Sequence, residues 1–142
     1  MSKFVSKENL AYYHSKIKGT IKPTILYEGS TNGNLTLTDN VENYDYVEIY
    51  YDVGNHEGQN SIKVKANELT IGDICIFGAT IDASAFPSNF GLINHYKRLT
   101  IRGKNLNVNA YGRWWQYYAD ANSVRDSQNQ TYITKILGYK EV

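Results

Sequence analysis

The most regular alternation of polar and apolar positions lies at residues 44–51, Tyr-Asp-Tyr-Val-Glu-Ile-Tyr-Tyr. In an extended strand successive side chains point to opposite faces, so Val47 and Ile49 share one face with Asp45 and Tyr51. The other face carries three tyrosines and one acid: Tyr44, Tyr46, Glu48 and Tyr50. A helix would scatter these residues around its circumference, so the pattern predicts a strand. We expect a central strand of an antiparallel β-domain, with an aliphatic core face and a tyrosine-rich face that can meet water, a sugar or a second sheet.

A period of two recurs downstream of residue 23. It predicts strands at 25–28, 34–38, 61–66, 73–80, 96–102, 104–110, 111–119 and 131–139. We expect the first two to form a hairpin, and 96–102 to pair with 104–110 around Gly103. Segment 73–80 is continuously apolar, which is typical of a strand buried on both faces, and its Cys75 is expected to be buried. With a polar loop at 53–60 and long loops at 81–92 and 120–130, the pattern predicts a mainly β fold, an antiparallel β-sandwich or jelly-roll-like domain.

Residues 6–18 have the pattern of a short helix, which Ser6 can cap and Gly19 can end. Leu10, Tyr13 and Ile17 form one narrow apolar stripe. Such a stripe is typical of a helix that packs on one neighbour or on copies of itself, and it equally suits a helix lying on its own sheet. We therefore divide the chain into a helix and linker at 1–22, for attachment or oligomerisation, and a β-sandwich domain at 23–142. The candidate oligomer interface combines the helix stripe with the tyrosine face: Leu10, Tyr13, Ile17, Tyr46 and Tyr50.

Composition excludes several classes of protein. A formal net charge of +1, from 15 basic and 14 acidic residues, argues against a nucleic-acid-binding domain. The apolar runs are too short to span a membrane, and the N-terminal residues lack the features of a signal peptide. The single cysteine excludes an internal disulfide and fits synthesis in a reducing compartment.

The most aromatic segment, residues 113–118, is the candidate binding surface. As a strand it would place Arg113, Trp115 and Tyr117 on one face. The opposite face would carry Trp114, Gln116 and Tyr118. A ring lying flat on a sugar, with a polar side chain beside it for the hydroxyls, is a general saccharide-binding arrangement. The alternative is that one tryptophan lies in the core and the other in a sheet or subunit interface.

The sequence gives no positive evidence for an enzyme. His14, His56 and His95 are dispersed, so we expect no metal site, and no cofactor motif is present. The acids are numerous enough to leave a glycosidase-type carboxylate pair open. They are Asp39, Glu42, Asp45, Glu48, Asp82 and Asp120.

Four segments resemble virion proteins of phages that infect Gram-positive bacteria. Lys-Phe-Val-Ser-Lys-Glu-Asn-Leu at 3–10, followed by Tyr-Tyr at 12–13, resembles their short N-terminal helices. Leu-Tyr-Glu-Gly-Ser-Thr-Asn-Gly-Asn-Leu-Thr-Leu at 26–37 resembles the opening hairpin of their β-domains. Segment 44–51 is similar to the next strand, and Ile-Thr-Lys-Ile-Leu-Gly-Tyr-Lys at 133–140 to the closing one. The resemblance covers most of the chain as a pattern of strands and turns, without a catalytic motif.

This resemblance implies a phage or prophage structural protein of the tail-fibre, baseplate or receptor-binding type, often a trimer. A tail fibre would carry a long shaft, whereas one short helix precedes the β-domain here, so a small accessory protein or a separately encoded tip stays open. We expect a non-enzymatic virion protein, made in the bacterial cytoplasm, that binds itself, other virion proteins and a host cell-surface saccharide. We expect it to bind no nucleic acid and to insert into no membrane. One alternative is a capsid-decorating or assembly protein that binds only virion proteins, and a third class is a glycan-degrading enzyme.

Overall fold

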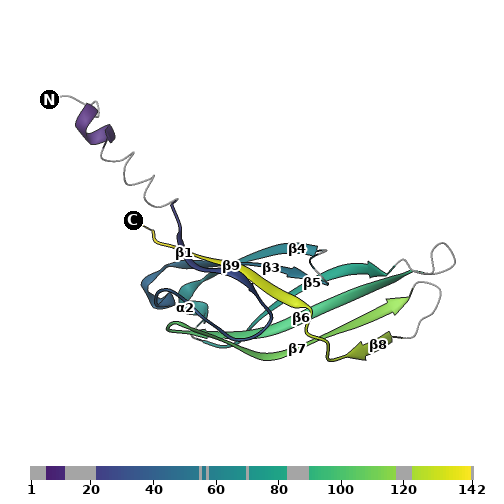
Figure 1. Ribbon diagram of the computed structural model, residues 1–142. Coiled ribbons are helices and arrows are strands. Elements are labelled where there is room, and N and C mark those ends of the chain that lie inside the picture. The colour runs from purple at the N-terminus through teal and green to yellow at the C-terminus, as the bar shows by residue number, and fades with distance from the viewer. Residues whose placement is uncertain are drawn as a thin grey trace.

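The computed structural model describes residues 6–11, 22–54, 56, 58–69, 71–82, 90–117 and 123–141. The fold is mainly β, with antiparallel sheets arranged as a β-sandwich-like domain (Figure 1). Along the chain the strands and short helices are β1 (Thr24–Thr31), β2 (Leu35–Thr36), the 3₁₀ helix η1 (Val41–Asn43), β3 (Tyr46–Val53), β4 (Gly58–Lys65), α2 (Ala66–Leu69), β5 (Ile74–Asp82), β6 (Gly91–Arg102), β7 (Asn105–Tyr117), β8 (Ser123–Asp126) and β9 (Thr131–Tyr139).

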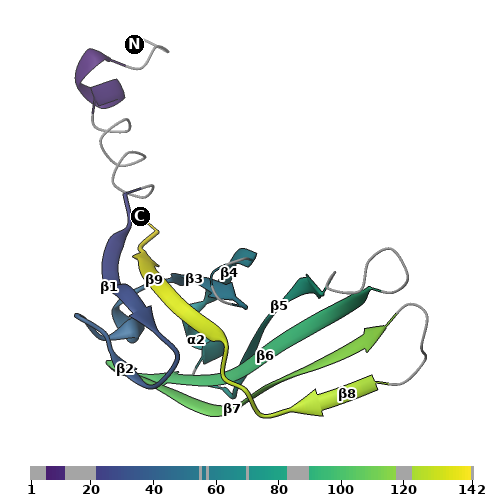
Figure 2. The same ribbon diagram turned by 45° about the vertical axis from the view of Figure 1, so that its right-hand side comes forward.

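The strands form two antiparallel sheets. The first sheet has the order β1-β9-β3-β4, and the second has the order β2-β7-β6-β5, with β8 added beside β7. Both Figure 1 and Figure 2 show β5, β6 and β7 running on past the first sheet, toward β8. Part of the second sheet is therefore covered by the first, and its far end is not.

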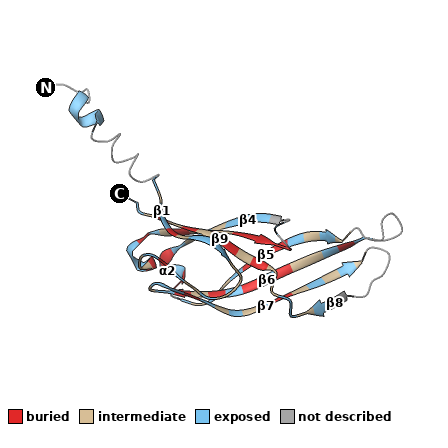
Figure 3. Cartoon of the chain, viewed as in Figure 1, coloured by how far each residue is buried: buried red, intermediate tan, exposed pale blue. Residues whose placement is uncertain are grey.

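The core lies where the two sheets overlap, and Figure 3 shows the buried residues gathered there. Val47, Ile49 and Tyr51 of β3 all point into it, which confirms the core face predicted for the organising strand. From the second sheet, β6 contributes Leu99 and Ile101, both fully buried. The predicted hairpin around Gly103 is also confirmed, because β6 pairs with β7 and Gly103 takes the positive φ of 59° that this tight turn requires.

The predicted hairpin between 25–28 and 34–38 is wrong. The first segment, β1, pairs with β9 of the first sheet, whereas β2 pairs with β7 of the second. The turn-rich residues between them carry the chain from one sheet to the other. Lys97, which is fully buried in β6, fixes this crossing, because its Nζ donates to the carbonyl oxygen of Asn32 at 2.5 Å.

The expectation that 73–80 is buried on both faces is also wrong, and so is the burial of Cys75. The strand β5 is an edge strand of the second sheet. Its inner face contributes Ile76 to the core, but Cys75 and Phe77 on the other face are exposed. The apolar segment 73–80 therefore buries the side chains of one face in the core and exposes the apolar side chains of the other face to solvent.

Further details differ from the sequence prediction. Tyr44, assigned to the outer tyrosine face, precedes β3 and is buried, with its ring against Gly138 of β9. The loops predicted at 53–60 and 81–92 are shorter, since β3, β4, β5 and β6 extend into them, and β8 lies within the one predicted at 120–130.

Of the predicted N-terminal helix, the structure describes residues 6–11. Residues 7–11 are helical, and Ser6 caps them as predicted, because its Oγ accepts the backbone N–H of Asn9 at 3.2 Å. The rest of the predicted helix, including Tyr13 and Ile17, lies outside the described residues.

Candidate binding surface on the second sheet

The predicted aromatic segment lies in β7, and its side chains alternate between the two faces of the second sheet. Trp114 and Gln116 are on the outer face, where Trp114 is 41% exposed. Arg113, Trp115 and Tyr117 are on the inner face. Tyr118 lies outside the described residues. The six candidate residues therefore do not form one surface.

The inner-face residues already have polar partners. Nε of Arg113 donates to both carboxylate oxygens of Asp126, at 2.9 and 3.0 Å, and its guanidinium lies 5.0 Å from the ring centre of Trp115. This hydrogen bond from Arg113 holds the pKa of the Asp126 carboxyl below its usual range. Tyr117 donates its hydroxyl to Oδ2 of Asp82 at 3.0 Å, and that bond raises the pKa of the tyrosine. Arg113 thus joins β7 to β8, and Tyr117 joins β7 to the end of β5.

The outer face gathers aromatic and amide side chains from neighbouring strands. Phe77 of β5 lies opposite Tyr96 of β6, and Asn94 of β6 lies opposite Trp114 of β7. Tyr96 can lie across β7 because residue 112 is glycine: a Cβ there would come within 2.9 Å of the Tyr96 hydroxyl. These side chains border a hollow of about 440 Å³, which we call the first hollow. Its lining comprises Cys75, Phe77, Asn94, His95, Tyr96, Arg113, Trp114, Arg125 and Asp126.

A second hollow of about 330 Å³ adjoins the first on the same face. It is lined by Phe90, Leu92, Asn94, Trp114, Gln116 and Tyr117. Asn94 and Trp114 line both hollows, so the Trp114 ring stands between them. Apolar rings with a few placed amides are the composition of a saccharide or small-molecule site.

Sequence reasoning found Trp114 and Gln116 but missed Phe77, Asn94 and Tyr96. The predicted hairpin at Gly103 comes within one residue of the correct pairing. Its register near the turn, extended along β6 and β7, would pair Asn94 with Arg113, but a register shift between Arg98 and Leu99 pairs Asn94 with Trp114 instead. The contribution of β5 is missed as well, because its continuously apolar sequence predicts a strand that is buried on both faces.

The candidate oligomer residues Tyr46 and Tyr50 lie half-exposed on the outer face of the first sheet, as predicted. The hydroxyls of Tyr50 and Tyr139 both donate to Oε1 of Glu48, at 2.7 and 2.8 Å. Burial raises the pKa of Tyr139 to about 12, and the Glu48 carboxylate contributes to the shift. Lys63 lies 4.2 Å from the ring centre of Tyr139. On the helix, Leu10 is exposed.

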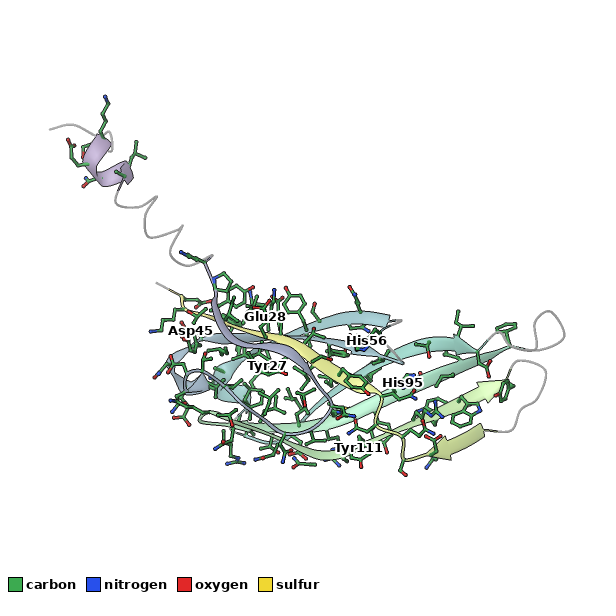
Figure 4. The ribbon with its side chains drawn as sticks, in the orientation of Figure 1. Tyr27, Glu28, Asp45, His56, His95 and Tyr111 are labelled. Carbon is green, nitrogen blue, oxygen red and sulfur yellow. The ribbon has the colours of Figure 1, made fainter. Side chains whose placement is uncertain are left out.

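The described residues contain no cluster of three or more metal-ligating side chains. His56 and His95, both labelled in Figure 4, each have a hydrogen-bond partner. His56 Nδ1 lies 2.7 Å from Oδ2 of the buried Asp52, and His95 Nε2 lies 3.2 Å from Oγ1 of Thr80. His14 is outside the described residues.

One further hollow, of about 270 Å³, includes two acids, Asp45 and Glu141. Oδ2 of Asp45 accepts the backbone N–H of Glu141 at 2.6 Å, so this carboxylate holds the C-terminal segment beside β3. The glycosidase alternative requires two carboxylates facing one cleft, and Asp45 and Glu141 are the two acids that line this hollow. Among the helical segments that the structure describes, none has the length and apolar character needed to cross a bilayer.

No protein-family model matches this chain, and no curated protein is significantly similar to it in sequence.

Proposed function

We propose that this chain is a non-enzymatic virion protein of a phage or prophage, and that it binds a saccharide of the host cell surface. The binding surface is the outer face of the second sheet, at Trp114. The observation that carries the proposal is the exposed Trp114 ring standing between two adjacent hollows, with Asn94 beside it in both. The virion assignment rests on the resemblance of four segments to phage structural proteins.

The chemistry of this surface suits a sugar. The exposed faces of Trp114, Tyr96 and Phe77 can pack on the C–H groups of a pyranose ring, while Asn94 and Gln116 offer amide donors and acceptors to its hydroxyls. Strands carry all five side chains, so the surface is largely formed before the ligand arrives. Preorganisation lowers the entropy cost of binding.

The second candidate is a capsid-decorating or assembly protein that binds only other virion proteins. The observation that favours it is the apolar row formed by Phe77, Ile81 and Leu92, all exposed on the same face as Trp114. Exposed apolar patches commonly mark protein interfaces. Binding to host cells or isolated cell-wall glycan separates this candidate from the first.

Replacing Trp114 by alanine is expected to weaken binding to host cell-wall glycan at least about tenfold, because an aromatic anchor contributes roughly 1–2 kcal/mol or more. Tyr111→Ala is the matched control. Tyr111 is in the same strand and is 42% exposed, but the alternation of side chains along β7 places it on the opposite face of the sheet from Trp114. Binding is measured by sedimentation with purified cell walls, and folding by circular dichroism. Equal binding by folded Trp114→Ala and wild-type protein would place the saccharide elsewhere.

The proposal also includes a homo-oligomer, expected to be a trimer. Light scattering coupled to size-exclusion chromatography should give a mass above that of the 16.2 kDa chain. Tyr46→Ala combined with Tyr50→Ala should shift it toward the monomer if the tyrosine face is the interface. A wild-type protein that stays monomeric at high concentration would remove this part of the proposal.

Release of soluble sugar from cell walls, abolished by Asp45→Asn or Glu141→Gln, would instead support the enzyme class.

A further inference from the structure

We propose that the saccharide is an acidic chain of at least two units that binds in one orientation, with its anionic group beside Arg125 in the first hollow and a neutral unit in the second. This inference rests on the proposed function, and it adds the chemical class and polarity of the ligand. Arg125 becomes the residue that sets specificity.

Arg125 lies in β8, directly opposite Trp114 of β7. It is exposed and lines the first hollow. Within the part of the chain that the structure describes, its guanidinium has no ion pair and no hydrogen bond. A guanidinium with five free donors next to an exposed aromatic ring is suited to a carboxylate or phosphate, which it can bind with two parallel hydrogen bonds.

The other charges near the first hollow are balanced. Asp126 is also in its lining, but both of its oxygens accept from Arg113. Arg98, on the outer face of β6, forms a salt bridge with Asp73 at 3.2 Å. The Arg125 charge is therefore not cancelled by these neighbours, and the first hollow favours an anion.

The second hollow has the opposite character. No charged side chain is among the residues that line it, which offer rings, one leucine and the amides of Asn94 and Gln116. An unpaired anion placed there would lose hydration without gaining a cation, so this hollow favours an uncharged sugar unit.

The shared Trp114 links the two hollows into one site. Because the ring borders both, a ligand that fills only one hollow leaves part of the ring uncovered. A chain of two or more units can cover both sides of it. The arrangement of a cationic hollow, a ring and a neutral hollow then fixes the direction in which the chain lies.

The test compares four polymers by calorimetry: polygalacturonate with carboxylates, phosphomannan with phosphate diesters, neutral dextran, and polyglutamate as an anion without sugar. Wild type should bind polygalacturonate or phosphomannan at least about tenfold more tightly than dextran or polyglutamate, since hydrogen bonds to charged groups are stronger than those between neutral groups. Which of the two acidic polymers binds distinguishes a carboxylate ligand from a phosphate ligand. Arg125→Gln should remove this preference, and a digalacturonate should bind more tightly than galacturonate.

Arg102→Gln is the control for a general loss of positive charge, because Arg102 is also exposed on the second sheet but lies at the Gly103 turn. Cys75, the single cysteine of the chain, lines the first hollow and reports its occupancy. A bound acidic polymer should slow alkylation of its thiol, and dextran should slow it less.

The outcomes separate the two proposals. Trp114-dependent binding of dextran with no preference for acid would overturn this inference and leave the proposed function standing. Equal losses in Arg125→Gln and Arg102→Gln, or equal binding of polyglutamate, would also overturn the inference. If none of the polymers binds and host cell walls do not bind either, both proposals fail.

Discussion

Replacing Lys97 by methionine is expected to lower the free energy of unfolding by about 3 kcal/mol, because three buried or partly buried acceptors would each lose a donor. The Lys97 side chain is fully buried. Its Nζ donates to the carbonyl oxygens of Asn32 and Thr131, at 2.5 and 2.7 Å, and to Oδ1 of Asn129 at 2.6 Å. These groups lie on the crossing between the sheets and at the entry to β9, so one ammonium group joins both to β6. Methionine keeps the length of the side chain but donates nothing.

Denaturation by guanidinium at pH 7 measures this loss, with Lys65→Met as the control, since Lys65 is an exposed lysine of β4. A change of less than half a kcal/mol in Lys97→Met, equal to that in the control, would show that the three acceptors find other donors.

The pH dependence of the free energy of unfolding provides a second test of the role of Lys97. Burial lowers the pKa of Lys97 to about 8. Between that value and the ordinary lysine pKa of 10.5, the unfolded chain binds more protons than the folded one, so the free energy of unfolding rises with pH. From pH 7.5 to 9.5, wild type should gain about 2 kcal/mol relative to Lys97→Met. Parallel pH profiles for the two proteins would show instead that the three acceptors keep the ammonium charged.

Periodicity predicted which segments are strands more reliably than it predicted their partners. Val47 and Ile49 could be assigned to the core because alternation depends only on the local chain. The partner of β2 could not be assigned, since a turn such as 29–33 serves a hairpin and a crossing between sheets equally well. The contact that decides between them comes from Lys97, 65 residues away from Asn32.

The candidate surface was predictable in part for the same reason. The aromatic composition of residues 113–118 predicts Trp114 as a binding residue. The alternation of a strand correctly places its side chain on the opposite face of the sheet from Arg113 and Trp115. The position of β5 at a sheet edge depends on strand order, which the local pattern does not encode. A run of apolar residues indicates burial only when the strand has neighbours on both sides and both faces covered. Phe77 is 66% exposed, so part of that run contributes to the proposed binding surface rather than to the core.

Replacing Gly138 by alanine is expected to cost about 3 kcal/mol of stability, at the upper end of the usual cost of overpacking. A Cβ at this position would come within 2.6 Å of the Tyr44 ring. Neither side can move easily. Gly138 is paired on both sides, with β1 and β3, and the Tyr44 hydroxyl donates to Oδ2 of Asp39 at 2.9 Å. Gly72→Ala is the control, because a Cβ there would have no neighbour within 4 Å.

A double-mutant cycle tests whether the Tyr44 ring is the cause. Tyr44→Ala should itself be destabilising by roughly 3 kcal/mol or more, since it removes a buried aromatic side chain. In that background the added Cβ no longer meets the ring, and alanine loses less backbone entropy than glycine on folding. Gly138→Ala should then be neutral or slightly stabilising, which gives a coupling of about 2–3 kcal/mol between the two sites. Additive losses would mean that Gly138 is required by the β9 backbone itself, and that the Tyr44 ring lies over it without depending on it.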